Sequence, residues 1–243
     1  MRTPTRLLIA GFTLASISLG AFAQPAKPTE KPKEPAQPAQ PAKQPDEKPP
    51  APAVEALVYV TFKTSAGDIV LELNQEKAPL TVKNFLSYVD KGHYNGTVFH
   101  RVIANFMIQG GGFGTDGKQK PTDPGVKNEW QNGLKNVRGS ISMARIGGQP
   151  DSGTSQFFIN VENNANLDQK QSDGAAYAVF GRVVDGMDTV EAIRRAKVGP
   201  DARGEMSKPA SPVEVKEAKR LTPDEISKLR EKLSPSTPAP DKK

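Results

Sequence analysis

The chain has 243 residues, no cysteine and a formal net charge of +6. The lack of cysteine excludes a disulfide framework, a thiolate metal site and a thiol for lipid attachment. Residues 54–215 contain 18 basic and 18 acidic side chains, so the excess positive charge lies toward the two ends and the central part has no basic face for nucleic acid.

The first 23 residues have the pattern of a secretory signal peptide. Arg2 and Arg6 precede an apolar run over residues 7–22, and Ala-Phe-Ala at 21–23 fits a small-x-small cleavage site. An uncleaved anchor is the alternative, but Gly and Ser interrupt the run, which is short for a hydrocarbon core of about 30 Å. We expect export to the periplasm, with secretion or tethering by the uncleaved segment as alternatives, and no stable membrane insertion after cleavage.

Residues 24–54 are predicted to form a disordered linker. Ten of the 22 prolines lie between Gln24 and Ala53, among Ala, Lys, Glu and Gln. A segment with so few bulky apolar side chains cannot bury enough surface to offset the conformational entropy lost on ordering. Its composition favours extended, polyproline-like chain.

Residues 55–218 are predicted to form one mainly β domain. It opens with an antiparallel hairpin of residues 57–62 and 68–73. Helices are predicted over residues 79–91, with Pro79 first and Gly92 just beyond the end, and over 187–196. Further short β-rich runs lie at 98–102, 106–109, 139–144, 156–160, 178–183 and 213–218. Many short strands with two helices favour a closed antiparallel barrel, because closure removes exposed sheet edges. The periodicity of apolar residues alone does not exclude a β-sandwich.

Four sequence blocks resemble the cyclophilin family. Residues 99–111 read Phe-His-Arg-Val-Ile-Ala-Asn-Phe-Met-Ile-Gln-Gly-Gly, which is similar to the family's signature. Gly-Ser-Ile-Ser-Met-Ala at 139–144, Asp-Ser-Gly-Thr-Ser-Gln-Phe-Phe-Ile at 151–159, and Leu-Asp at 167–168 with Tyr-Ala-Val-Phe-Gly at 177–181 follow in the family's order. The resemblance implies an eight-stranded barrel capped by two helices, with an active groove on its outer face.

The resemblance implies a peptidyl-prolyl cis/trans isomerase (EC 5.2.1.8) that acts on proline-containing polypeptides without cofactor or metal. We expect the protein to be a monomer. Rotation about an X-Pro bond must break amide resonance, at a cost of about 18–20 kcal/mol, and is slow without catalysis. No bond is cleaved, so a catalyst needs an apolar slot for the proline ring, polar groups for the flanking backbone, and a cation near the proline nitrogen.

The resemblance also implies the site residues. Arg101 supplies the cation on a planar fork that never deprotonates, and Gln109 is a polar clamp on the substrate backbone. The substrate-binding residues are Phe106, Met107, Ala144, Phe158, Leu167 and Tyr177. Taken singly, each apolar residue is better explained as core and Arg101 as a surface ion-pair partner; their joint order and spacing favour a site.

Two positions depart from the pattern of many eukaryotic cyclophilins, which have Trp where this chain has Asn166 and His where it has Tyr177. The hydroxyl of Tyr177 can still form hydrogen bonds with a substrate. Asn166 removes a large ring from the groove rim, so we expect weak binding of the family's cyclic peptide inhibitor.

Two other motifs and one rival function compete with this interpretation. Residues 112–118 match most of a phosphate-binding loop, but Gln119 replaces the Ser or Thr that holds magnesium and Pro121 opposes the helix that should follow. Asp151 in Asp-Ser-Gly-Thr resembles an aspartic protease elbow, whose chemistry needs a second carboxylate. A non-catalytic proline-peptide binding or chaperone module is the remaining rival, and the presence of both Arg101 and Gln109 favours the enzyme.

The charged tail, residues 219–243, contains a capping box at 222–225, Thr-Pro-Asp-Glu. A short helix is therefore predicted over residues 225–233. Its narrow apolar stripe, formed by Ile226, Leu229 and Leu233, can dock on the barrel or meet a partner, and a loosely ordered tail is an equal alternative.

Overall fold

The computed structural model describes residues 56–234. The predicted signal peptide and the linker at 24–54 lie outside the described residues, as do the last nine. In the described part, no helix is both long enough and apolar enough to cross a membrane.

The larger sheet is antiparallel and contains most of the strands between residues 57 and 220. Its members are β1 (Leu57–Thr64), β2 (Gly67–Asn74), β3 (Thr97–Val98), β4 (Arg101–Ile103), β5 (Met107–Gly110), β6 (Ser140–Met143), β7 (Phe157–Asn160), β8 (Val179–Asp185) and β11 (Glu214–Arg220). These nine strands are ordered β3-β11-β1-β2-β8-β6-β7-β5-β4.

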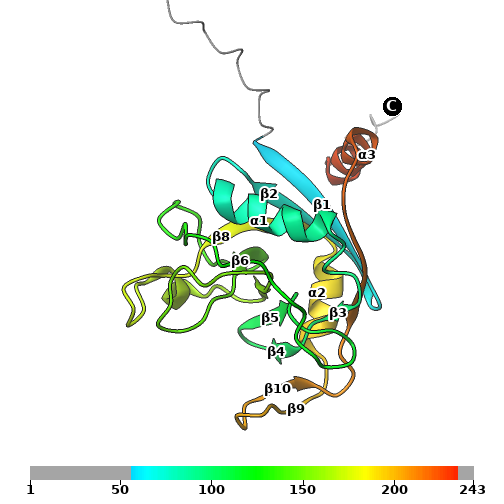
Figure 1. Ribbon diagram of the computed structural model, residues 1–243. Helices are drawn as coiled ribbons and strands as arrows, with labels where there is room; N and C mark the ends of the chain where they lie inside the picture. Colours follow the sequence, from blue (N-terminus) through cyan, green and yellow to red (C-terminus); the bar gives the residue numbers. More distant parts are fainter. Residues whose placement is uncertain (1–55, 235–243) are drawn as a thin grey trace, which may run out of the picture. The chain divides into compact units, whose positions relative to one another are not determined.

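The sheet curls so that its two ends return toward each other (Figure 1). The first and last strands of the order, β3 and β4, are separated in the chain only by Phe99 and His100. Residues 98–102 were predicted as one strand, but the pairing changes there: β3 pairs with β11 and β4 with β5. If β3 and β4 are counted as one interrupted strand, the sheet has the eight strands predicted, and the mainly β, antiparallel fold is confirmed.

Large aromatic side chains fill the interior of the curled sheet. Phe62, Phe85, Tyr94, Phe157 and Phe180 are completely buried. The ring centroids of neighbouring pairs lie 5.0 to 6.0 Å apart, for example in Phe85–Tyr94 and Phe62–Phe85. Tilted and edge-on rings at this spacing add to the stabilisation gained from burial alone.

Helix α1 (Pro79–Asp90) covers one opening of this interior. Its buried residues Val82, Phe85, Leu86 and Val89 recur at the three- and four-residue spacing of one helix face. The chain turns away just after the helix at Gly92, which has φ of 65°, a conformation that costs glycine little. At the other end the Glu129 carboxylate accepts hydrogen bonds from the backbone N–H groups of residues 80 and 81, and so serves as the cap.

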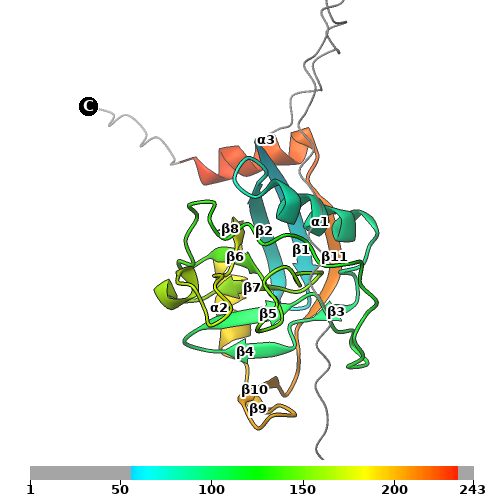
Figure 2. The ribbon, with the colours of Figure 1, turned by 60° about the vertical axis from the view of Figure 1, so that its left-hand side comes forward.

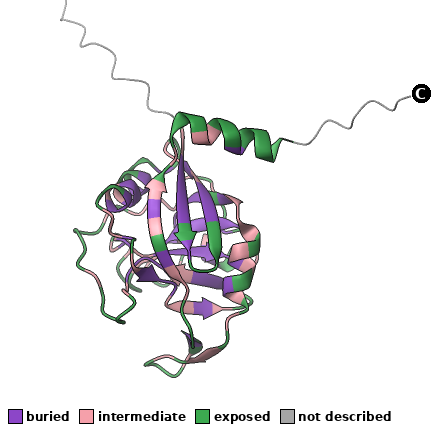
Figure 3. Cartoon of the chain, turned by 90° about the vertical axis from the view of Figure 1, so that its right-hand side faces the viewer, coloured by how far each residue is buried: buried purple, intermediate pink, exposed green. Residues whose placement is uncertain are grey.

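Two further helices differ in which face of the sheet they cover. α2 (Met187–Arg194) buries Val190 and Ile193 in the main core. α3 (Pro223–Leu233) has the predicted capping box and lies outside the sheet (Figure 3). There its Leu229 packs with Tyr59 of β1 and Val70 of β2. The apolar stripe of the tail helix therefore docks on the barrel.

A two-stranded ribbon, β9 (Val198–Pro200) and β10 (Met206–Pro209), was not predicted. It projects from the body of the domain next to β4 (Figure 2). Its tight turn is held by the Asp201 carboxylate, which accepts hydrogen bonds from the N–H groups of Arg203 (2.8 Å) and Glu205 (2.9 Å). The ribbon places the Glu205 side chain at the edge of the groove described below.

Candidate active site

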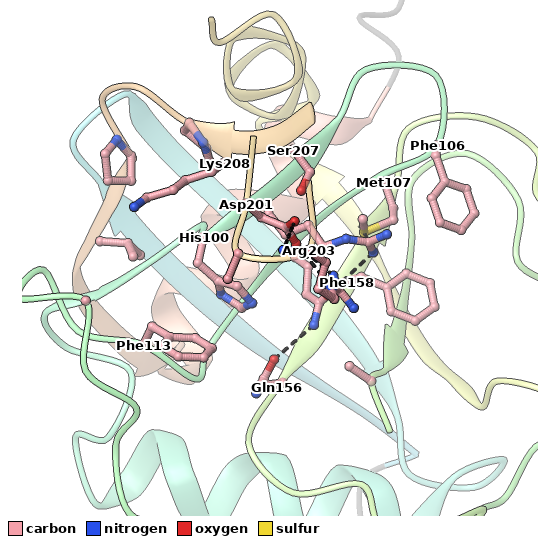
Figure 4. A pocket seen from close by; sticks show the side chains of 18 of the residues that line it. His100, Phe106, Met107, Phe113, Gln156, Phe158, Asp201, Arg203, Ser207 and Lys208 are labelled. Carbon is pink, nitrogen blue, oxygen red and sulfur yellow. Dashed lines mark hydrogen bonds and ion pairs between the residues drawn. The ribbon is translucent and has the colours of Figure 1, made fainter. Parts of the chain in front are cut away.

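A groove with a volume of about 1020 Å³ lies along β4, β5 and β7 (Figure 4). Side chains alternate between the two faces of a strand, so Ile108 and Phe157 enter the core while their neighbours on the same strands face the groove. All eight residues predicted for the site line it: Arg101, Phe106, Met107, Gln109, Ala144, Phe158, Leu167 and Tyr177. The structure thus brings them together, while their catalytic and binding roles stay predictions.

One end of the groove is an apolar slot. Met107, Phe158 and Leu167 are buried there, and Phe106, Ala144 and Tyr177 pack around them. A 3-10 helix, η1 (Ala165–Asp168), carries Leu167. This helix is anchored because the Asp168 carboxylate accepts hydrogen bonds from the backbone and the side-chain amide of Asn136. A slot of this kind suits a flat apolar ring such as that of proline.

Tyr177 is held from both sides. Its ring meets Phe158 edge-on at 5.7 Å between centroids, and the Arg145 guanidinium lies 4.6 Å from its centroid. Arg145 is itself fixed by an ion pair of 2.5 Å with Asp173, and only 3% of the Arg145 side chain is exposed. Hydrogen bonds from Arg145 lower the pKa of the Asp173 carboxyl below its usual value. This support for the slot was not recognised from the sequence, although Arg145 directly follows one of the family blocks.

Arg101 and Gln109 form the polar part of the groove because they are directly opposite each other in the β4–β5 ladder. Arg101 Nη1 donates to Gln109 Oε1 at 3.4 Å, and Gln109 Nε2 donates to Gln156 Oε1 at 2.9 Å. The close view places Met107 and Phe158 on one side of the groove, and His100 and Phe113 on the other (Figure 4).

Glu205 makes the closest contacts to the Arg101 guanidinium. Arg101 Nε donates to one carboxylate oxygen at 2.6 Å and Nη2 to the other at 2.8 Å, which is the bidentate geometry of strong Arg–carboxylate pairs. These bonds lower the pKa of the Glu205 carboxyl. Neither Glu205 nor Gln156 was singled out from the sequence. Gln156 lies within a family block, whereas nothing in the pattern around Glu205 marks it.

Two other residues discussed from the sequence, Asp151 and Asn166, lie outside the predicted set of site residues. Asp151 accepts a hydrogen bond from the backbone of Asn128. Asn166 is exposed and does not line the groove. Within residues 56–234, no three His, Asp or Glu side chains gather in a way that could hold a metal ion.

His100 should make stability depend on pH. Its Nδ1 is buried without a hydrogen-bond partner, and burial lowers the pKa of the imidazole from 6.5 to about 4. Between these values the unfolded chain binds a proton that the folded chain does not, so stability falls as pH falls through this range. From pH 7.5 to pH 5 we expect a loss of about 2 kcal/mol from this residue.

Urea unfolding of the native chain and of His100→Gln at the two pH values tests this expectation. His93, whose pKa burial also lowers, is present in both proteins, so the difference between them isolates His100. Equal pH dependence in the two proteins would contradict the assignment.

Comparisons with known proteins converge on one family. A family model described as cyclophilin type peptidyl-prolyl cis-trans isomerase/CLD matches residues 59–220. Peptidyl-prolyl cis-trans isomerase A of Dickeya dadantii (strain 3937) is 53% identical over 173 residues, which are 70% of this chain and 88% of that protein. Peptidyl-prolyl cis-trans isomerase cyp18 of Streptomyces antibioticus is 53% identical over 164 residues, 67% of this chain and 98% of the relative.

A solved structure gives the same result at the level of the fold. The crystal structure of a cyclophilin type peptidyl-prolyl cis-trans isomerase from Cryptosporidium parvum superposes with a TM-score of 0.55 at 28% sequence identity. The match covers 68% of this chain and 98% of that structure.

Proposed function

We infer that this chain, which belongs to the cyclophilin-type peptidyl-prolyl cis-trans isomerase family, uses the groove on β4, β5 and β7 to hold an X-Pro segment while Arg101 assists its rotation. The observation that carries this mechanism is the position of the Arg101 guanidinium at the edge of an apolar slot, where it shares one groove with Met107 and Phe158. Its substrates are proline-containing polypeptides.

The chemistry follows from what changes during rotation. As the amide twists, the nitrogen lone pair of proline leaves conjugation and becomes a better hydrogen-bond acceptor. An N–H of Arg101 directed at that nitrogen stabilises the twisted state more than the planar ones, and only such differential binding speeds the step. Gln109, whose amide is held by Gln156, can bond the flanking substrate backbone. No nucleophile is required, because no covalent bond is broken.

Exchange NMR on a short X-Pro peptide tests the activity and separates it from the rival function. The native chain is expected to accelerate exchange between cis and trans signals, and a peptide with Ala in place of Pro serves as the binding control. Binding of the X-Pro peptide without faster exchange would instead identify a proline-peptide binding module.

Inhibitor binding provides a separate prediction. Asn166 does not itself line the groove, but it is exposed and directly precedes Leu167, which lines the slot, so its small side chain offers no large ring to a bulky apolar ligand bound there. We expect cyclosporin to bind weakly, and Asn166→Trp to tighten binding by about tenfold, or roughly 1.4 kcal/mol, because an indole adds apolar contact area. Titration calorimetry of the two proteins measures the change. Tight binding by the native chain, unchanged in the variant, would show that this rim position is irrelevant.

We also propose that the protein acts as a monomer on exported or unfolded polypeptides in the periplasm. The support for export is the signal-like pattern of residues 1–23, in which two arginines precede an apolar run and a small-x-small site. N-terminal sequencing of protein recovered from a periplasmic extract tests the proposal, with Gln24 as the expected first residue.

A further inference from the structure

We propose that Glu205 is a positioning residue for Arg101: it fixes the guanidinium so that Nη1 is the nitrogen presented to the substrate. This inference rests on the role of Arg101 proposed above. It adds a residue from the β9–β10 turn to a site that is otherwise built on the barrel strands, the residues next to them and η1.

The division of the guanidinium donors supports this role. Glu205 takes one N–H from Nε and one from Nη2, at 2.6 and 2.8 Å. Nη1 is directed to the groove side, where its protein contacts are long: 3.4 Å to Gln109 Oε1 and 3.9 Å to the sulfur of Met107. A substrate can therefore replace these weak Nη1 contacts without disturbing the two short bonds that orient the plane.

The turn holds the backbone of Glu205 on both sides. The Glu205 N–H donates to the Asp201 carboxylate at 2.9 Å, and its carbonyl accepts from the N–H groups of Asp201 at 2.7 Å and Ser207 at 2.8 Å. Gly204, just before it, has φ of 84°, which a residue with a side chain adopts only with strain. Because this segment is constrained, the Glu205 carboxylate has a fixed position and can orient the flexible side chain of Arg101.

The charges around the pair favour the Arg101 contact over alternatives. A second cation near Glu205 is Arg203, whose Nη2 lies 3.7 Å from the Glu205 carboxylate, but the Arg203 side chain is 72% exposed and bonds mainly to Asp201. Arg101 has 23% of its side chain exposed and no second carboxylate partner among the ion pairs of residues 56–234. Without Glu205, the Arg101 fork would keep only its 3.4 Å contact to Gln109 and its contact to sulfur.

The experiment compares Glu205→Gln with the native chain. Gln keeps the length of the side chain but presents an amide N–H to one arm of the fork, so it cannot accept both bonds. We expect kcat/KM for an X-Pro peptide to fall about 10- to 100-fold, the scale associated with small misplacements of catalytic groups, while peptide affinity changes less than twofold. Glu205→Asp keeps the charge on a shorter arm and should recover part of the rate.

Nitrogen-15 NMR of the Arg101 side chain reports the contact directly and does not depend on activity. In the native chain the two bonds should slow rotation about Nε–Cζ and give a resolved, downfield Nε–H signal, which Glu205→Gln should lose. The matched control is Glu217→Gln, which removes a carboxylate paired at 2.7 Å with Lys63 on the far strands β1 and β11. It should leave both the rate and the Arg101 signal unchanged.

A double mutant separates positioning from a general effect on folding. In an Arg101→Ala background, Glu205→Gln should cause no further loss of rate, because neighbours that act through one group are not additive. A further loss there, a native rate in Glu205→Gln alone, or an unchanged Arg101 signal overturns the proposal. If the native chain accelerates no exchange at all, the proposed isomerase function fails instead, and the NMR signal still decides whether Glu205 orders Arg101.

Discussion

Arg101→Ala is expected to lower kcat/KM for an X-Pro peptide by about 10² to 10³, equivalent to roughly 2.7 to 4 kcal/mol, while peptide affinity changes little. The magnitude is that of removing one preorganised donor aimed at charge developing in the transition state. The ground-state proline is held mainly by the apolar slot around Met107 and Phe158, which this substitution leaves in place. Exchange NMR gives the rate and fluorescence titration the affinity.

Arg101→Lys tests whether the positive charge alone is sufficient for catalysis. It keeps the positive charge but cannot form the two parallel bonds that Arg101 makes to Glu205. Its ammonium group is therefore not oriented, and we expect it to recover only part of the rate. If Arg101→Ala stays folded by circular dichroism and isomerises at nearly the native rate, Arg101 is not the catalytic group.

Phe157→Ala should produce a large loss of stability. Phe157 is fully buried, and its ring centroid lies 5.4 Å from Phe62, 5.8 Å from Phe85 and 5.7 Å from Tyr94. Truncation leaves a cavity that these large rings cannot fill, so we expect a cost of about 3–5 kcal/mol in the free energy of unfolding. For a domain of this size the midpoint of thermal unfolding should fall by roughly 10 °C.

The neighbouring residue provides a matched comparison, because Phe158 follows on the same strand but faces the groove. Phe158→Ala opens space in a groove that solvent already enters, so its stability cost should be smaller than that of Phe157→Ala. Its loss of X-Pro peptide affinity should be larger. If Phe158→Ala costs more stability than Phe157→Ala in calorimetry, and less affinity in peptide titration, then the assignment of Phe157 to the core and Phe158 to the groove is wrong.

The site residues were predicted from the family blocks, and short-range patterning explains how several of them come together. Arg101 and Gln109 are eight residues apart on two strands joined by a turn, so a hairpin places them opposite each other. Phe158 follows a core residue on β7, and strand alternation therefore sends it to the other face. The family blocks also indicated that residues on strands that are distant in sequence but paired in the sheet belong to one site.

The contacts that were missed are those with no local signal. Glu205 lies 104 residues beyond Arg101, and the strands that carry it are three and four residues long. They contain Pro200, Lys208 and Pro209 where alternating apolar residues would mark a strand. The interruption of the predicted strand at Phe99 and His100 was missed for a related reason. A strand that changes its pairing partner keeps the same pattern of apolar residues, so hydropathy does not reveal the change.

The docked tail helix has a consequence for how the domain can be attached to other structures. Leu57, at the start of β1, packs against the same outer cluster as Leu229 of α3, whereas the groove lies by β4 and the β9–β10 ribbon, at the opposite pole (Figure 2). Both ends of the described chain thus leave from one side. A protein fused directly to either end of residues 56–234 would therefore be attached at the pole away from the groove.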